Sequence, residues 1–147
     1  MFLIKEEIGF IALNKNKIVG YSFLRLNGQK ERKHLASFGI IVPKKFQGQG
    51  IGKELIKFTI KKARELNLKK IWLITRQDNF KAKNLYESFG FITEGFFNEN
   101  IKQGNKFLGE YSLALFLDEK KLKKKSLNEM LDLVDGVLLD AKGKVIK

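Results

Sequence analysis

Short apolar runs rich in β-branched residues alternate along this chain with two segments of helical periodicity. The apolar runs predict strands over residues 9–13, 18–26, 33–42, 71–75, 91–97 and 106–117. Apolar positions recur at helical spacing over 51–67, and a shorter helix is predicted over 79–89, with Gly90 as its C-terminal stop. The order β-β-β-α-β-α-β-β predicts a mixed α/β (α+β) sheet.

Polar segments and the single proline mark the connections. Residues 14–17 (Asn-Lys-Asn-Lys) predict a turn between the first two strands, and the polar stretches 28–32 and 98–105 predict loops. Pro43 lacks an N–H group and therefore ends the pairing of the third strand. The nearly continuous apolar run 71–75 predicts a buried, central strand.

Three glycines at alternate positions, Gly48, Gly50 and Gly52, lie between a predicted strand and a predicted helix. Such a loop adopts positive φ freely and leaves backbone N–H groups uncovered at a helix N-terminus, where an anion is favoured. A tight turn without a ligand is the alternative interpretation. The spacing excludes a P-loop, because Lys53 is followed by Glu54, and it also differs from the dinucleotide fingerprint G-x-G-x-x-G.

Two motifs carry a resemblance to a known family. Residues 47–52 (Gln-Gly-Gln-Gly-Ile-Gly) resemble the Q/R-x-x-G-x-G/A signature of the GNAT superfamily of acyl-CoA-dependent N-acyltransferases. Residues 79–91 look like the N-x-x-A-x-x-L-Y-x-x-x-G-F block of that family, at the expected distance downstream. The resemblance covers residues 10–117 and implies the GNAT-like fold, a central, mostly antiparallel sheet flanked by helices.

The resemblance also implies a site for acetyl-CoA as co-substrate. In the family, the strand before the glycine loop splays from its neighbour, so the pantetheine arm pairs with it and the loop holds the pyrophosphate. The cofactor-binding residues implied in this way are Ile41, Val42, Gln47, Gly48, Gln49, Gly50, Ile51, Gly52, Lys53 and Asn79. A backbone N–H near Val42 would face the acetyl oxygen. Tyr86 matches the tyrosine that protonates the leaving sulfur, and packing in the core is its alternative role.

No general base is identified. Many family members carry a glutamate in the strand before the loop, but residues 37–41 contain no carboxylate. His34 precedes Val42 by eight residues, roughly 26 Å of extended strand, so we expect it to be structural or at the surface. The remaining alternatives are an amine that arrives neutral, or a carboxylate acting through water. The carboxylates considered are Glu31, Glu94 and Glu110.

The acceptor is expected to be a small primary amine, such as an amino acid, because the sequences around the two motifs look like that branch of the superfamily. Acetylation of a protein α-amine and a non-catalytic acyl-CoA-binding regulatory module stay open as alternatives. A homodimer is also left open.

Composition narrows the alternatives. The absence of cysteine and the single histidine argue against a metal site and against a cysteine thioester intermediate. The net charge of +13 favours polyanions, yet there are few arginines and the lysines are scattered, so a nucleic-acid partner is disfavoured. Lys44, Lys45 and Lys53 flank the glycine loop and are placed to attract phosphates.

No run of about 18–20 apolar residues and no signal peptide is present, so a cytoplasmic protein without membrane contact is expected.

Two regions depart from the family pattern. A strand and two helices usually precede the matched region and wall off the acceptor site, whereas only residues 1–9 precede it here. An open acceptor site, a covering subunit and a longer gene product are the alternatives. We expect a transferase domain over 1–117, followed over 118–147 by a lysine-rich linker and a helix and hairpin that dock on the core or on a partner.

Overall fold

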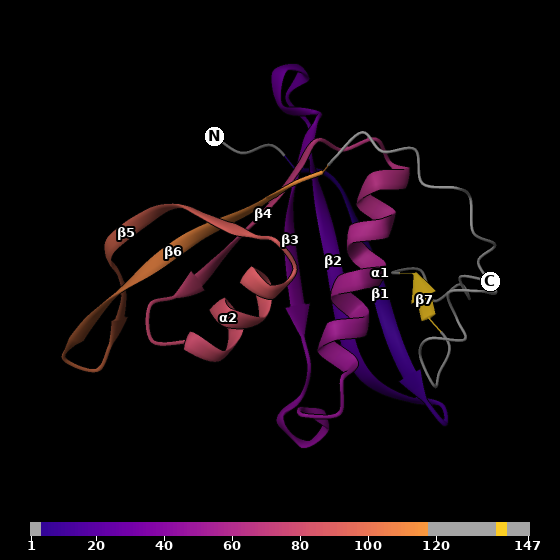
Figure 1. Ribbon diagram of the computed structural model, residues 1–147, viewed down its shortest axis with the longest axis horizontal. Helices are drawn as coiled ribbons and strands as arrows, with labels where there is room; N and C mark the ends of the chain where they lie inside the picture. Colours follow the sequence, from indigo (N-terminus) through magenta and orange to yellow (C-terminus); the bar gives the residue numbers. More distant parts are fainter. Residues whose placement is uncertain (1–3, 118–137, 141–147) are drawn as a thin grey trace.

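The computed structural model describes residues 4–117 and 138–140, which form one seven-stranded sheet and two helices (Figure 1). The strands are β1 (Ile4–Asn14), β2 (Lys17–Asn27), β3 (Leu35–Ile41), β4 (Lys70–Arg76), β5 (Ile92–Gln103), β6 (Lys106–Phe116) and β7 (Leu138–Asp140). The helices are α1 (Ile51–Glu65) and α2 (Phe80–Ser88), with 3-10 turns η1 (Lys30–Arg32) and η2 (Lys44–Phe46). The strand order is β5-β6-β4-β3-β2-β1-β7, and every pair is antiparallel except β3 with β4. The predicted mixed sheet is confirmed.

The turn predicted over 14–17 is confirmed, whereas the loop predicted over 98–105 is wrong. Lys15 and Asn16 have φ of 46° and 64°, and they connect β1 and β2 through the pair Asn14 and Lys17. β5 continues to Gln103 and pairs with β6 up to Lys106. This part of the hairpin extends beyond β4 and is mostly exposed, so its residues carry no apolar alternation from which a strand would be predicted.

Both helices end in the same left-handed motif. At the end of α1, Asn67 has φ of 57°, and the N–H of Leu68 donates to the carbonyl of Ala63 over 3.1 Å. At the end of α2, Gly90 has φ of 94°, and the N–H of Phe91 donates to the carbonyl of Tyr86 over 3.2 Å. These are Schellman bonds, so the predicted stop at Gly90 is confirmed with its mechanism.

Both helices pack on the same face of the sheet. Phe58 of α1 makes an edge-to-face contact with Phe10 of β1, with ring centroids 5.1 Å apart. Tyr86 of α2 makes the same type of contact with Phe38 of β3 over 6.0 Å. Cross-strand register places Phe10 and Phe38 on one side of the sheet, where the core is built from apolar side chains with little or no exposure.

The opposite face has no cover from the described residues. β4 is central, as predicted, but its burial alternates, because Ile71 and Leu73 are buried beneath the helices while Ile74 is exposed. The prediction of a fully buried strand over 71–75 is therefore wrong for one face, because a run of apolar residues does not reveal which side the helices cover.

β7 pairs antiparallel with β1, placing Leu138 opposite Ala12. This short part of the tail therefore joins the edge of the sheet. The helix predicted after Ser126 and the second hairpin strand at Val145 and Ile146 lie outside the described residues. Within the part of the chain that is described, no helix is long and apolar enough to cross a bilayer.

Candidate functional site

The two central parallel strands separate halfway along their length. β3 and β4 pair at only three positions, where Leu35, Ala36 and Ser37 lie opposite Lys70 to Trp72. Beyond Ser37, β3 pairs only with β2 and β4 only with β6, and the strands diverge (Figure 1). Backbone groups of residues 38–41 that point away from β2 therefore have no strand partner among the described residues.

The glycine turn follows the separated half of β3. Gly48 and Gly50 have φ of 77° and 83°, in the left-handed region that favours glycine. A Cβ added at either position would meet no atom within 4 Å, so backbone conformation, rather than crowding, selects glycine at both. The left-handed Gly50 is also the residue from which α1 begins.

The start of α1 offers donors without acceptors in the helix. The first helical bond runs from the N–H of Glu54 to the carbonyl of Gly50 over 3.1 Å, so the N–H groups of Ile51, Gly52 and Lys53 precede it. Together with the helix dipole, these donors favour an anion. The predicted residue Gln47 instead ties the loop together, because its Nε2 donates to the carbonyl of Val42 over 2.9 Å.

Gly52 lies where β3 and both helices meet. A Cβ at this position would have only ordinary contacts of 3.9–4.0 Å, with Ile40 Cδ1, Val42 Cγ2 and Leu85 Cδ2, and its φ is not in the left-handed region. The fold itself therefore accepts a side chain here. Sequence reasoning did not assign a role to Ile40 or Leu85, although Leu85 stands beside Tyr86 in the second motif.

Tyr86 is buried beneath the separated half of β3. Its ring contacts Phe38 and Phe91, with centroids 6.0 and 5.6 Å away. Burial raises the pKa of Tyr86 to about 12. Its hydroxyl has no hydrogen-bond partner among the described residues. Asn27 Nδ2 is the only side-chain polar atom among them that is both fully buried and unpartnered, so the Tyr86 hydroxyl must be in contact with solvent.

Asn79 caps the helix that carries Tyr86. Its Oδ1 accepts a hydrogen bond from the N–H of Ala82 over 3.2 Å, so one of its polar atoms has a structural role. Asn79 is an exposed residue, and its side-chain amide nitrogen makes no hydrogen bond with the described residues, so it can donate to a ligand.

The carboxylates considered as bases do not lie together. Glu94 pairs with Lys70 over 2.6 Å, in the row where β3 and β4 still pair, and Glu31 belongs to η1 before β3. Glu110 lies opposite Arg76, at the end of β4 beyond the point of separation, and accepts from Asn100 Nδ2 over 2.6 Å. His34 is exposed at the other end of β3 from the glycine turn, as expected.

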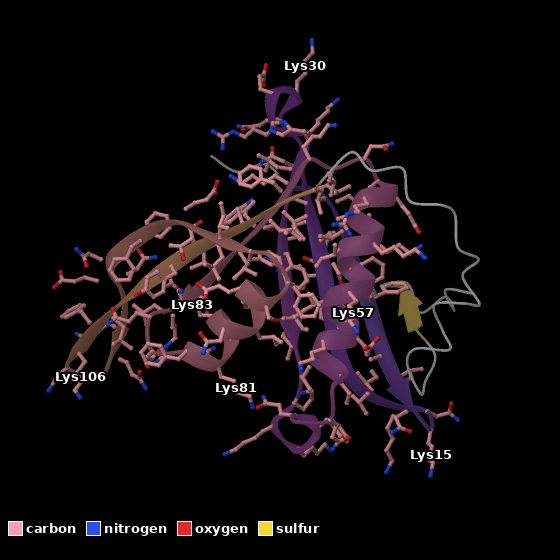
Figure 2. All side chains as sticks on the ribbon, in the orientation of Figure 1. Lys15, Lys30, Lys57, Lys81, Lys83 and Lys106 are labelled. Atoms are coloured by element: carbon pink, nitrogen blue, oxygen red, sulfur yellow. The ribbon has the colours of Figure 1, made fainter. Side chains whose placement is uncertain are left out.

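The lysines are dispersed over the molecule. Figure 2 shows labelled ones at the β1–β2 turn, at η1, on both helices and at the β5–β6 turn: Lys15, Lys30, Lys57, Lys81, Lys83 and Lys106. Several described lysines are paired with glutamates, including Lys57 with Glu54 over 3.1 Å. Among the described residues, no three histidine, aspartate or glutamate side chains gather into a metal-binding group.

The divergent strands, the glycine turn and the tyrosine on the second helix together form the arrangement that the two motifs led us to expect of an N-acyltransferase fold. A model described as the Acetyltransferase (GNAT) family matches residues 1–91, more than half of the chain. The chain belongs to the GNAT acetyltransferase family.

Individual relatives are distant. The chain is 25% identical over 105 residues to the L-amino acid N-acetyltransferase AaaT of Escherichia coli (strain K12), covering 71% of this chain and 65% of that protein. It is 34% identical over 87 residues to N-alpha-acetyltransferase 30 of Dictyostelium discoideum, covering 58% of this chain and 46% of that protein. A GNAT-family acetyltransferase structure from Streptococcus pneumoniae matches with a TM-score of 0.72 at 23% identity, over 75% of this chain and 67% of that chain, which supports the fold alone. The chain spans less than two thirds of the length of these two curated relatives.

Proposed function

We propose that this protein transfers an acetyl group from acetyl-CoA directly to the primary amine of a small molecule such as an amino acid. One observation carries the proposal: the end of the β3–β4 pairing, the glycine turn and Tyr86 meet at one place. Gly52 sits against Ile40 and Leu85, and Tyr86, the neighbour of Leu85, packs on Phe38 in the same separated half of β3.

The glycine at position 52 supports a ligand at the turn. Glycine in a helix costs roughly 0.5–1 kcal/mol relative to alanine, and nothing among the described residues excludes a Cβ there. A diphosphate drawn close to the first N–H groups of α1 would need the space that this Cβ occupies. The residues 47–53 would hold the diphosphate, and Lys44, Lys45 and Lys53 would add positive charge.

The separated half of β3 supplies a backbone edge for the pantetheine arm, which would pair with Ile41 and Val42 as an added strand. The carbonyl of Val42 already accepts a hydrogen bond from Gln47. We therefore assign the other backbone polar group of Val42, its N–H, as the donor to the acetyl oxygen. A preorganised donor of this kind contributes roughly 3 kcal/mol in other acyl transfers. Asn79 would contact the cofactor through its free amide nitrogen.

Acetyl-CoA supplies a thioester: the amine nitrogen bonds to the carbonyl carbon, the C–S bond breaks, coenzyme A leaves as the thiolate, and the proton released by the amine passes to water. Tyr86, with a pKa of about 12, keeps its proton at neutral pH. Complete transfer of that proton to a thiolate of pKa about 8.5 would be uphill by about 5 kcal/mol. We therefore assign Tyr86 a hydrogen bond to the sulfur as negative charge develops on it, which is stronger in this desolvated setting than in water.

Calorimetry with acetyl-CoA tests the binding part of the proposal. Gly52→Ala should leave the thermal midpoint unchanged or raised and weaken acetyl-CoA binding by about tenfold or more, because the added Cβ meets the ligand rather than the protein. Gly95→Ala is the matched control, since a Cβ there meets nothing within 4 Å and its φ is ordinary. Equal affinity of the wild type and Gly52→Ala would contradict the assigned position of the diphosphate.

A thiol-release assay tests turnover. Tyr86→Phe keeps the ring contacts, so it should fold normally and bind acetyl-CoA while losing about 10²- to 10³-fold in turnover, the loss typical of one preorganised hydrogen-bond donor. Full turnover by this variant would remove Tyr86 from the chemistry.

The acceptor is assigned by a panel of amino acids, other small primary amines and short peptides. The relative named for L-amino acids supports the first class. The N-alpha-acetyltransferase relative favours a protein α-amine as the second candidate. Saturable acetyl-CoA binding with no turnover on any amine or peptide would instead identify a non-catalytic regulatory module.

A further inference from the structure

Gln77 joins the connection between β4 and α2 to the β5–β6 hairpin. Its backbone N–H donates to the carbonyl of Gly109 over 2.9 Å, and its side-chain Oε1 accepts from the N–H of the same glycine. In a regular antiparallel ladder, two opposed residues exchange both hydrogen bonds through their backbones. Here the side-chain amide of Gln77 replaces its backbone carbonyl, directly after the last paired row of β4, in which Arg76 lies opposite Glu110.

Because Gln77 pairs through its side chain, the chain can leave the sheet at once and enter α2 (Figure 1). The N–H of Asn79 donates to the carbonyl of Arg76 over 3.0 Å, which closes a turn. Asn79 then caps α2 by accepting from the N–H of Ala82. Hydrogen bonds between near neighbours thus run without a break from the end of β4 to the helix that carries Tyr86.

The hairpin holds Gly109 in a defined position. Gly109 is buried, and a Cβ at this residue would overlap the ring of Phe96 from β5. Phe96 also packs on Tyr111 of β6, with ring centroids 4.9 Å apart. The N–H of Gly109 therefore depends on Gln77 Oε1, since a buried donor that loses its acceptor is costly.

A second set of hydrogen bonds lies beside the first but is exposed. Arg76 Nε and Nη2 donate to the two carboxylate oxygens of Asp78 over 2.9 and 2.6 Å, and Nη2 also donates to Gln103 Oε1 of β5 over 2.7 Å. The side chains of Arg76 and Asp78 are 37% and 47% exposed, so their ion pair contributes little. We therefore expect Gln77 to hold the connection.

We propose, on the basis of the function proposed above, that Gln77 is a positioning residue of this acetyltransferase. It acts through other residues rather than on the reacting atoms. By fixing the start of α2 against the hairpin, it sets where Asn79 meets the cofactor and where the Tyr86 hydroxyl meets the sulfur. A misplacement of about 1 Å in such a group can lower the rate on the order of 10²-fold.

Hydrogen–deuterium exchange tests the positioning without any substrate. Gln77→Met keeps the length of the side chain and removes its acceptor, whereas Gln77→Glu keeps an acceptor oxygen. The amides of Asn79 and Lys83, which bond within the connection, should exchange about tenfold faster or more in Gln77→Met. In Gln77→Glu they should exchange as in the wild type. Unchanged exchange in Gln77→Met overturns the proposal.

Steady-state kinetics tests the consequence for turnover. Gln77→Met should lower kcat by about tenfold or more, and Gln77→Glu should stay within about twofold of the wild type. In the Tyr86→Phe background the same Gln77→Met change should lower kcat much less, because the hydroxyl that it positions is absent. Equal factors in both backgrounds overturn the proposal. A wild type without turnover would instead contradict the proposed function, and amide exchange would still decide the role of Gln77.

Ser22→Ala is the control for lost stability. It removes the buried hydrogen bond of 2.8 Å to Thr59, which joins β2 to α1 in another part of the molecule. Thermal melting establishes that this variant and Gln77→Met are both folded at the assay temperature. Ser22→Ala should keep the kcat of the wild type. A kcat as low as that of Gln77→Met would show that lost stability alone lowers turnover, which would overturn the proposal.

Discussion

On the face of the sheet that α1 and α2 cover, Gly20 of β2 lies beneath Leu55 and Ile51 of α1. On the opposite face, here called the open face, Gly39 of β3 lies beneath the ring of Phe23 from the neighbouring strand β2. The first contact joins elements distant in sequence, and the second lies within the sheet itself. The covered face therefore holds the core, and burial there supplies most of the stability. The open face is filled by side chains of the sheet itself, which can move outward.

The largest loss of stability should come from truncating a buried side chain on the covered face. Leu55 is fully buried, so Leu55→Ala should lower the free energy of unfolding by about 2–5 kcal/mol. Leu66→Ala, at the exposed C-cap position of the same helix, should change it by less than about 0.5 kcal/mol. Urea titration followed by circular dichroism measures both. Equal losses in the two variants would mean that burial beneath α1 does not hold the sheet.

Alanine at the two glycines should destabilise the two faces by different amounts. A Cβ at Gly20 would stand 2.7 Å from Leu55 Cδ1 and 3.0 Å from Ile51 Cγ2, so Gly20→Ala should cost about 1–3 kcal/mol through overpacking. Gly39→Ala would overlap only the far edge of the Phe23 ring, which can swing into solvent. Its cost should stay below about 1 kcal/mol, partly offset by the smaller freedom of the unfolded chain.

Thermal melting of these two alanine variants decides the point. If Gly39→Ala proves as costly as Gly20→Ala, Phe23 is held in place by something beyond the contacts of the described residues.

Removing one hydroxyl group from each face should give a smaller difference in stability. Ser22 and Thr59 form a buried hydrogen bond of 2.8 Å between β2 and α1, so Ser22→Ala should cost about 1–2 kcal/mol. On the open face the hydroxyl of Tyr21 donates to Glu7 over 2.9 Å in an exposed position, and Tyr21→Phe should cost under about 0.5 kcal/mol. The midpoints of denaturant unfolding measure both losses of stability, provided that the slope of the free energy against denaturant concentration is unchanged. A reversed order would show that the exposed bond is the stronger one.

The smallest effect concerns pH. Hydrogen bonding from Arg25 lowers the pKa of Glu7 from its ordinary value of 4.5. The folded pKa is depressed, so this pair contributes stability above about pH 4.5 that is lost as the pH falls through the folded pKa. Because both side chains are more than a third exposed, the contribution should be below about 1 kcal/mol.

Comparing the wild type with Arg25→Met between neutral pH and pH 3 isolates this contribution, and added salt should reduce it. An unchanged difference between the two proteins across that range would show that the pair contributes nothing.

Most elements could be predicted from local patterns, and the errors have non-local causes. The first strand begins at Ile4 rather than at Gly9, because the carboxylate of Glu7 is satisfied by Arg25 and Tyr21 from the next strand. Periodicity cannot supply that information, since the partners lie 14 and 18 residues away. For the same reason, no local pattern showed that both helices share one face.

The second motif shows how far the candidate site could be read from sequence. Asn79 caps α2, Gly90 adopts the left-handed conformation that ends it, and Phe91 packs on Tyr86. These residues therefore have structural reasons to be present. Tyr86 has a hydroxyl for which the described residues provide no partner, and its role, like that of the glycine turn, stays a prediction until a ligand is bound.

The early separation of β3 and β4 has a consequence for handling the protein. Between them lie two short strand edges whose amide groups have no strand partner in the part of the chain that the structure describes, in the interior of a sheet where edges are normally absent. A molecule bound between them would pair with both strand edges. It should slow deuterium uptake by the amides of residues 38–41 and prevent other polypeptide chains from pairing with these edges. Preparations kept with such a molecule should therefore precipitate more slowly than bare ones.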